Sequence, residues 1–360
     1  MDADIIIVGS GIGGATTAAA LAPSGRRILI LERGERLADA PHCRDPQAIF
    51  RDGRFRPEES WLDGEGRPFN PGNYYYVGGN SKFYGAVLIR YRAEDFRPIR
   101  HMGGTTPGWP VGYEDYEPWY ARAEAMFEVR GTEDDPTDPP RSAPFPHPPV
   151  PDEPEIADLR ARLRRIGLHP SHLPLGVDLD RWLERAKTPW DAFPDTTGAK
   201  MDAESVGIAQ ALRHPNVTLL TGARVAALEA DGDRVTALRL ADGRRLTAAT
   251  VVLAAGAVNT AALLLSSGSE AHPRGLANRS DQVGRNFMNH NASAVLAVHP
   301  WRRNRSVYQK TLMINDYYLS GGPSGEPLGN VQMLGRVSGP ILAASSGLPR
   351  RAAHWIADHA

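Results

Sequence analysis

Two short apolar runs, separated by a stretch of small residues, dominate the start of the chain. The first run, residues 5–8 (IIIV), leads into a glycine-rich turn, and the second, residues 28–31 (ILIL), ends at Glu32. The small residues between the turn and the second run predict a helix. The resulting order of strand, turn, helix and strand predicts a βαβ unit of the dinucleotide-binding kind.

The turn has the chemistry that a diphosphate requires. Gly9 allows the chain to leave the first strand in a tight turn, Gly11 lets the backbone approach a pyrophosphate, and Gly14 lets the helix pack on the strand. The pyrophosphate would lie at the helix N-terminus, where unpaired N–H groups and the helix dipole favour an anion. Glu32 has the spacing of an acid that binds an adenosine ribose.

Further helices and strands follow from the pattern downstream. Helical spacing predicts helices within residues 109–130, over residues 155–166, after a possible cap at Asp202, and over residues 257–265. In the second of these, we expect the arginines to form a solvated face: Arg160, Arg162, Arg164 and Arg165. Strand-like runs occupy residues 217–220, 224–229, 234–240 and 250–253, with hairpin turns at Asp231-Gly232 and Asp242-Gly243.

Other stretches predict loops. Residues 40–75 show little periodicity, and residues 132–154 are dominated by Pro, Asp and Thr, which is typical of a linker or surface loop. Periodicity also weakens after Asn286.

Three more segments are compatible with a cofactor site. Residues 78–85 (GGNSKFYG) form a second glycine turn, Val225 lies in a predicted strand, and residues 251–256 (VVLAAG) form an apolar strand that ends in small residues. The second turn could approach a flat ring or a phosphate, and the strand at 251–256 could bring the chain to the cofactor again. Taken singly, each segment also fits ordinary structure: a plain β-turn, a core valine and a generic α/β strand.

Composition narrows the class of protein. The formal net charge of −1 argues against nucleic acid or a charged membrane surface as a partner, and no apolar run approaches the length of a membrane span. Asp2 and Asp4 precede the first apolar run, where a signal peptide would need basic residues. The single cysteine, Cys43, excludes an internal disulfide or a Cys-rich metal site. We therefore expect a cytoplasmic protein with no metal site.

Taken together, these segments resemble the glucose–methanol–choline (GMC) family of FAD-dependent oxidoreductases over most of residues 4–330. The resemblance rests on GSGIGG with Glu32, VGGNSKFYGAVLIR, GWPVGYEDYEPWYARAE, and VVLAAGAVNTAALLLSSG continuing into GLANRSDQVGRNFMNH. It implies an α/β fold: a Rossmann-like FAD-binding domain with a parallel sheet (residues 1–100 and 195–290) and an incomplete α+β substrate-binding region (residues 101–194 and 291–360).

The resemblance also implies the residues that hold FAD. In some relatives a histidine near the second turn bonds covalently to the flavin, whereas Lys82, Phe83 and Tyr84 occupy this stretch here, so we expect noncovalent FAD. Many relatives have Asn where this chain has Tyr84, which indicates a divergent branch. The expected cofactor-binding residues are Gly9, Ser10, Gly11, Ile12, Gly13, Gly14, Glu32, Arg33, Gly78, Gly79, Asn80, Ser81, Gly85, Val225, Ala255 and Gly256.

The family reaction implies oxidation of a CH–OH group of an alcohol or sugar, with hydride transfer to flavin N5 and a histidine as proton acceptor. In the family this histidine comes from a C-terminal segment that also supplies the last strand and helix of the FAD domain. We find no match to that segment, and we expect a structural role for His290, so no catalytic residue is assigned.

Three hypotheses therefore remain open. The chain is a flavin-dependent alcohol or sugar oxidoreductase that is incomplete or completed by another polypeptide, or it is a truncated FAD-binding protein without turnover. An NAD(P)-dependent dehydrogenase is disfavoured, because the second glycine turn and VVLAAG suit a flavin better. Loss of a strand and helix should expose apolar surface, so we also expect poor solubility or a partner chain. The electron acceptor is unknown.

Overall fold

The computed structural model describes residues 2–288 and 290–360, so Met1 and Asn289, both in the expected FAD-binding domain, lie outside the described residues. The chain packs as two compact units. The first unit comprises Met1–Asp39, Phe55–Lys82 and Asp202–Val295, and the second comprises Ala40–Arg54, Phe83–Met201 and Leu296–Ala360. The domain boundaries expected from the sequence stay a prediction. Residues 40–54, 83–100 and 195–201, expected in the FAD-binding domain, pack within the second unit, and residues 291–295, expected in the substrate-binding region, pack within the first.

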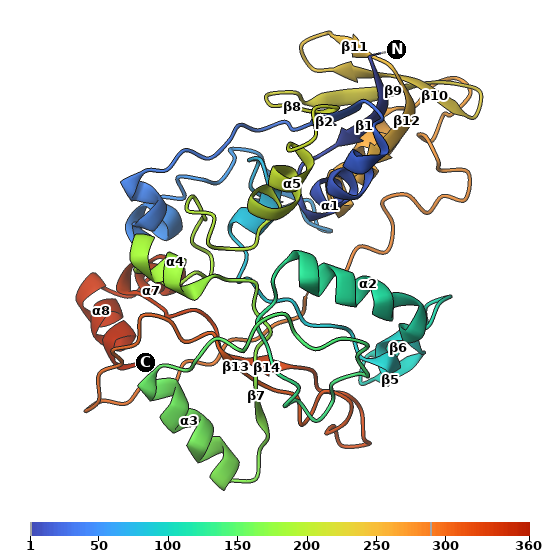
Figure 1. Cartoon of the computed structure of the whole chain (residues 1–360). Helices are drawn as coiled ribbons and strands as arrows, with labels where there is room; N and C mark the ends of the chain where they lie inside the picture. Colours follow the sequence, from blue (N-terminus) through green and yellow to red (C-terminus); the bar gives the residue numbers. More distant parts are fainter. Residues whose placement is uncertain (1, 289) are drawn as a thin grey trace. The chain divides into compact units, whose positions relative to one another are not determined.

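A four-stranded parallel sheet forms the centre of the first unit (Figure 1). Its strands lie in the order β12 (Ala248–Leu253), β1 (Ala3–Val8), β2 (Ile28–Leu31) and β8 (Val217–Leu220). Helix α1 (Ile12–Leu21), followed by a short 3₁₀ turn, η1 (Ala22–Ser24), connects β1 to β2. The predicted βαβ unit and the predicted α/β class with a parallel sheet are thus confirmed.

Both faces of this sheet are buried, which explains why its strands are apolar without alternation. Ile5, Ile7 and Ile30 pack against the alanines of α1, while Ile6 and Val8 pack on the opposite face against a second sheet. That second sheet is antiparallel and consists of β9 (Val225–Asp231), β10 (Arg234–Leu240) and β11 (Arg245–Leu246). The predicted hairpin turns at Gly232 and Gly243 are confirmed, and both glycines have positive φ.

The remaining elements of the first unit are helix α6 (Ala257–Ser266), the two-stranded ribbon β3 (Trp61–Leu62) and β4 (Pro68–Phe69), and the 3₁₀ turn η4 (Gly79–Lys82). The helix expected after Asp202 is shorter and more irregular than predicted. It consists of a π-helical turn, η6 (Glu204–Ile208), and one α-helical turn, α5 (Ala209–Ala211). A carboxylate oxygen of Asp202 accepts a hydrogen bond of 2.9 Å from the Ser205 N–H, as a cap would.

The second unit contains five α-helices among the described residues. They are α2 (Tyr113–Met126), α3 (Pro154–Arg165), α4 (Leu179–Arg185), α7 (Gly339–Ser346) and α8 (Arg350–His359). An antiparallel sheet has the order β14 (Val331–Gln332), β13 (Leu312–Ile314) and β7 (Pro170–His172), and β5 (Ile99–His101) pairs with β6 (Gly104–Thr106). Short helical turns are η2 (Pro41–Arg44), η3 (Gln47–Arg51) and η5 (Ala93–Phe96). Among the described residues, every helix is too short or too polar to cross a membrane.

One expectation about α3 is wrong. Arg160, expected on a solvated face, is only 5% exposed. Its guanidinium donates hydrogen bonds to the Asp152 carboxylate at 2.5 Å and to the Pro170 carbonyl at 3.0 Å. The cause is tertiary: α3 packs beside β7, and the arginine donates to backbone and carboxylate acceptors that this packing buries.

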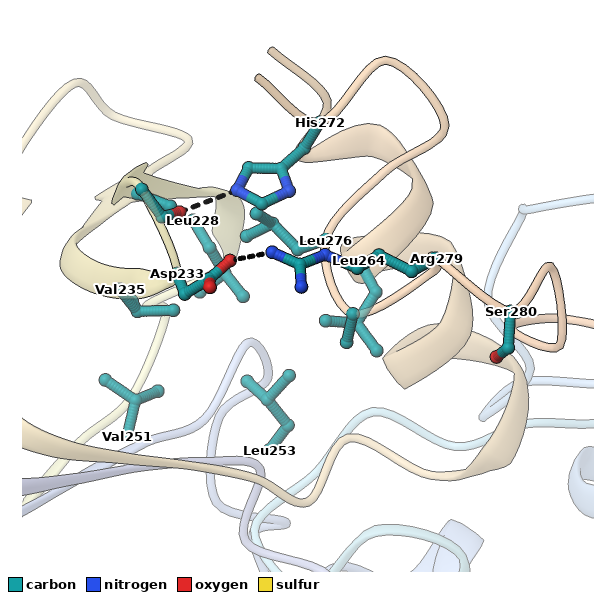
Figure 2. A pocket seen from close by; sticks show the side chains of 13 residues that line it. Leu228, Asp233, Val235, Val251, Leu253, Leu264, His272, Leu276, Arg279 and Ser280 are labelled. Atoms are coloured by element: carbon teal, nitrogen blue, oxygen red, sulfur yellow. Dashed lines mark hydrogen bonds and ion pairs between the residues drawn. The ribbon is translucent and has the colours of Figure 1, made fainter.

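An apolar hollow of about 440 Å³ lies between the second sheet, β12 and α6 (Figure 2). The residues that line it include Asp233 and Arg279, which form an ion pair. They also include His272, whose ring forms a 2.7 Å hydrogen bond with the Gly232 carbonyl. Among the described strands, β12 is an edge strand of the parallel sheet. The apolar side chains of the hollow are Leu228, Val235, Val251, Leu253, Leu264 and Leu276.

We expect this hollow to bind an apolar dye and to promote self-association, because contiguous apolar surface of this kind gains free energy when it leaves water. Val251→Lys should lower both the fluorescence of added anilinonaphthalene sulfonate and the apparent mass in light scattering. Thr250→Lys, at an exposed position of the same strand, is the matched control and should change neither. Equal dye binding by both variants would contradict the expectation.

Candidate functional site

The first glycine turn places the N-terminus of α1 at the carboxyl end of β1. Gly11 is the N-cap, and in the described part of the chain no side chain caps this helix. The first backbone hydrogen bond of the helix runs from the Ala15 N–H to the Gly11 carbonyl at 2.9 Å. An ideal Cβ on Gly11 or Gly13 would meet no atom within 4 Å. Open space therefore faces a helix end whose N–H groups favour an anion.

Gly9 and Gly14 are required for a different reason. Gly9 has a φ of 103°, and a Cβ there would overlap the carbonyl oxygen of Ala254, just beyond β12. A Cβ on Gly14 would overlap the carbonyl oxygen of Gly9. Both glycines thus permit backbone to approach backbone, at the strand edge and at the helix–strand contact.

The acid at the end of β2 is buried and already oriented. Glu32 is 5% exposed, and its Oε2 accepts hydrogen bonds from the Ser10 N–H at 3.1 Å and the Ser10 hydroxyl at 2.6 Å. Its Oε1 accepts one from the Gly34 N–H at 2.9 Å. A carboxylate has about four acceptor positions, so Glu32 retains capacity for a ribose hydroxyl.

The second glycine turn packs on the first. Gly78 has a φ of 95° and donates its N–H to the Ser10 hydroxyl at 3.1 Å. Gly79 has a φ of 57°, and a Cβ there would lie 3.5 Å from the Gly11 Cα. Asn80 is exposed and accepts a hydrogen bond from the Tyr74 N–H at 2.9 Å. We call Ser10, Gly11, Glu32, Gly78 and Gly79 the nucleotide cradle.

The second glycine turn contains a buried cation, Lys82, which was not among the expected functional residues. The Lys82 ammonium is 4% exposed and lies 3.0 Å from an Asp202 carboxylate oxygen and 2.8 Å from a Glu204 carboxylate oxygen. Arg36 forms a further ion pair with Glu204. These partners are about 120 residues away in the sequence, so the only local signal was a lysine within the glycine turn.

The other expected cofactor residues divide between the two units. Ala255 and Gly256 follow β12, where Gly256 (φ 84°) is the N-cap of α6 and a Cβ there would meet open space. Val225 begins β9, and the segment just before it runs beside Glu32, with the Ala223 N–H donating to the Glu32 carbonyl at 2.8 Å. Gly85 lies in the second unit, so its role at the cofactor stays a prediction.

Arg33 is held by protein groups next to the acid. Its guanidinium lies 3.7 Å above the centre of the Tyr75 ring and 3.6 Å from a Glu59 carboxylate oxygen. The Tyr75 hydroxyl hydrogen-bonds to Glu59 and accepts a 3.3 Å hydrogen bond from Asn259 on α6. Arg33 therefore links the end of β2 to the first turn of α6, and its expected contact with the cofactor stays a prediction.

We expect Gly14→Ala to lower the free energy of unfolding of the first unit by about 1–3 kcal/mol or more, because its Cβ would overlap the Gly9 carbonyl. Gly13→Ala, one residue earlier, is the matched control. Its Cβ would enter open space, so it should leave stability unchanged or raise it by up to about 1 kcal/mol. Thermal unfolding of the two variants measures the difference, and equal losses would contradict this account of Gly14.

Two histidine–aspartate pairs lie in the second unit. The His172 Nδ1 lies 2.6 Å from an Asp134 carboxylate oxygen, and the His169 Nδ1 lies 2.7 Å from Asp316. Burial tends to raise the pKa of Asp134, but the hydrogen bonds from His172 outweigh it and lower the pKa. Each carboxylate orients its imidazole and leaves Nε2 for another partner. Sequence spacing could not reveal these pairs. His290, by contrast, is exposed, and the structural role expected of it stays a prediction.

Asp138 lies in a buried cluster of charges in the same unit. Burial raises its pKa to about 6, partly opposed by Arg92, whose guanidinium lies 3.8 Å away. Arg92 is 1% exposed and is engaged more closely by Asp135, at 2.7 Å. Asp135 adds repulsion that raises the Asp138 pKa further.

We expect stability to fall as the pH rises through the Asp138 pKa. The folded protein binds the proton more tightly than the unfolded chain, so this contribution is fully present below about pH 4 and is lost as the pH rises through about 6. Asp138→Asn should therefore raise the melting temperature more at about pH 7.5 than at about pH 4. Asp180→Asn, at an exposed site of the same unit, is the control; equal gains from Asp138→Asn at both pH values would contradict the assignment.

Comparisons with known proteins agree with this arrangement. The family described as FAD dependent oxidoreductase matches residues 4–283. The chain is 34% identical to 6'''-hydroxyparomomycin C oxidase of Streptomyces lividus, covering 78% of this chain and 53% of that protein. It is 29% identical to paromamine 6'-oxidase of Streptomyces fradiae, covering 97% and 64%. The chain thus spans between about half and two thirds of the length of these relatives.

The fold is also found in solved structures. The crystal structure of pyridoxine 4-oxidase from Mesorbium loti superposes with a TM-score of 0.51 at 22% identity, covering 74% of this chain and 52% of that one. At this identity the likeness concerns the fold alone.

Proposed function

We propose that this chain, which belongs to the FAD-dependent oxidoreductases and is of the GMC type, oxidises a CH–OH group of an alcohol or sugar. One observation carries the proposal. The nucleotide cradle joins an uncapped helix N-terminus, a buried acid and a second glycine turn at the carboxyl edge of a parallel sheet. Dinucleotides bind at this edge in open α/β sheets.

The residues of the cradle suit FAD. The N–H groups at the start of α1 would bind the pyrophosphate, since Gly11 and Gly13 leave open space in front of them. Glu32 would accept hydrogen bonds from the adenosine ribose. Lys82, Phe83 and Tyr84 take the place of a covalently linked histidine, so we propose that FAD is held noncovalently.

When bound, FAD would supply the oxidant for transfer of a hydride from the carbon that bears the hydroxyl to flavin N5, and the hydroxyl proton would pass to a base. The contribution of this chain to that chemistry is to bind and orient the cofactor through Glu32 and the two glycine turns. The proton acceptor stays unassigned, and the electron acceptor is a matter for experiment.

The substrate class comes from the relatives. Two of them are named for oxidising 6'''-hydroxyparomomycin C and paromamine. We propose a hydroxylated sugar or a small primary alcohol as the substrate, and we propose that turnover can require a further polypeptide segment or a partner chain. The alternative, an FAD-binding chain without turnover, predicts cofactor binding with no reduction by any substrate.

We expect the purified chain to bind FAD and to release it on acid precipitation. Glu32→Ala should weaken FAD binding about tenfold or more, because a buried hydrogen bond to a charged group is lost; flavin fluorescence measures the dissociation constant. Glu229→Ala, on β9 and paired with Arg245, is the control and should bind FAD normally. A chain that binds NAD but not FAD would contradict the proposal.

Bleaching of the bound flavin under anaerobic conditions distinguishes an active oxidoreductase from an FAD-binding chain without turnover. Paromamine, simple aldoses and primary alcohols form the panel. Reduction of the flavin by any of these compounds excludes the hypothesis of an FAD-binding chain without turnover. A flavin that stays oxidised with every member, but is reduced by dithionite, supports it.

A further inference from the structure

Ser10, in the first glycine turn, is fully buried, with 0% of its surface exposed. Its hydroxyl donates a hydrogen bond of 2.6 Å to the Glu32 carboxylate. The same oxygen accepts a hydrogen bond of 3.1 Å from the Gly78 N–H. One hydroxyl therefore connects the acid at the end of β2 to the second glycine turn. A hydroxyl has a single proton to donate, and here it is committed to the carboxylate.

The second turn is also fixed from its other side. The Ser81 hydroxyl donates to the Gly78 carbonyl at 2.6 Å and accepts a hydrogen bond from the Ala203 N–H at 3.0 Å. The buried Lys82 ammonium, next in the sequence, holds Asp202 and Glu204. A displacement of this turn therefore moves the Gly78 N–H, and with it the position that the Ser10 hydroxyl must occupy.

We propose that Ser10 is a positioning residue that couples the second glycine turn to Glu32, so that the geometry of residues 78–81 determines how well the acid binds a ribose. This inference rests on the proposed function, since its main measurement is nucleotide binding. The Ser10–Glu32 hydrogen bond is short and charge-assisted, and the same Ser10 oxygen accepts the hydrogen bond from Gly78. A substitution of Ser81, which does not contact Glu32, should therefore weaken binding of the adenosine ribose at Glu32.

If the role of Ser10 were purely structural, its loss would lower stability and leave nucleotide affinity unchanged. A second buried serine provides a matched control. Ser267, at the end of α6, is 4% exposed. Its hydroxyl donates to the Leu263 carbonyl at 2.6 Å and accepts from the Leu228 N–H at 2.9 Å. Ser267→Ala thus removes a buried hydroxyl with the same donor and acceptor roles in the same unit, away from the nucleotide cradle.

ADP is the probe, because it contains the adenosine ribose and the diphosphate but no flavin. We expect Ser10→Ala to weaken ADP binding about tenfold in calorimetry. Ser81→Ala should also weaken it in the wild-type background but add little in the Ser10→Ala background. The combined loss should fall short of the product of the single losses by about threefold or more. Ser267→Ala should lower the melting temperature and leave ADP affinity unchanged.

Multiplicative losses, or a Ser81→Ala variant with normal ADP affinity in both backgrounds, would overturn the coupling and leave the proposed function standing. A wild-type chain that binds neither ADP nor FAD would overturn both. Amide hydrogen exchange adds a readout that needs no ligand. Exchange at Gly78 should accelerate in Ser10→Ala and not in Ser267→Ala, while Leu228 should show the reverse. Unchanged protection at Gly78 in Ser10→Ala would also overturn the proposal.

Discussion

The first unit depends on an approach of backbone to backbone that only glycine allows. At Gly9 the chain passes so close to the carbonyl of Ala254 that a methyl group would overlap it, and a methyl group on Gly14 would overlap the carbonyl of Gly9. These contacts fix the end of β1 against the end of β12 and fix α1 against β1. The direction of the α1 N-terminus follows from them, and Ser10, in the same turn, orients Glu32. Side-chain chemistry in the nucleotide cradle is thus a consequence of main-chain packing.

Much of this unit could be predicted from the sequence because its signals are local. The apolar runs of β1 and β2, the glycines of the first turn and the hairpin turns at Gly232 and Gly243 each depend on neighbouring residues. The shared sheet edge follows from the rule that parallel strands end together. The cofactor contacts themselves stay predictions.

What could not be predicted depends on partners distant in the sequence. Lys82 is separated by about 120 residues from the two carboxylates that hold it, and Ser10 is separated by 68 residues from Gly78. Arg160 looked like one of several solvated arginines because its burial depends on how α3 packs beside β7. Periodicity describes which face of an element is apolar, but it does not report which polar side chains find acceptors across the fold.

The hydrogen bonds between Ser10 and Glu32 have a consequence for how cofactor could come and go. A buried carboxylate that relied on the ligand for all its hydrogen bonds would be left unsatisfied whenever the ligand departed, and the surrounding segment would tend to open. Glu32 keeps three donors of its own. At Glu32 the empty and occupied forms can therefore share one backbone conformation, and loss of a ligand there would give this segment no reason to unfold.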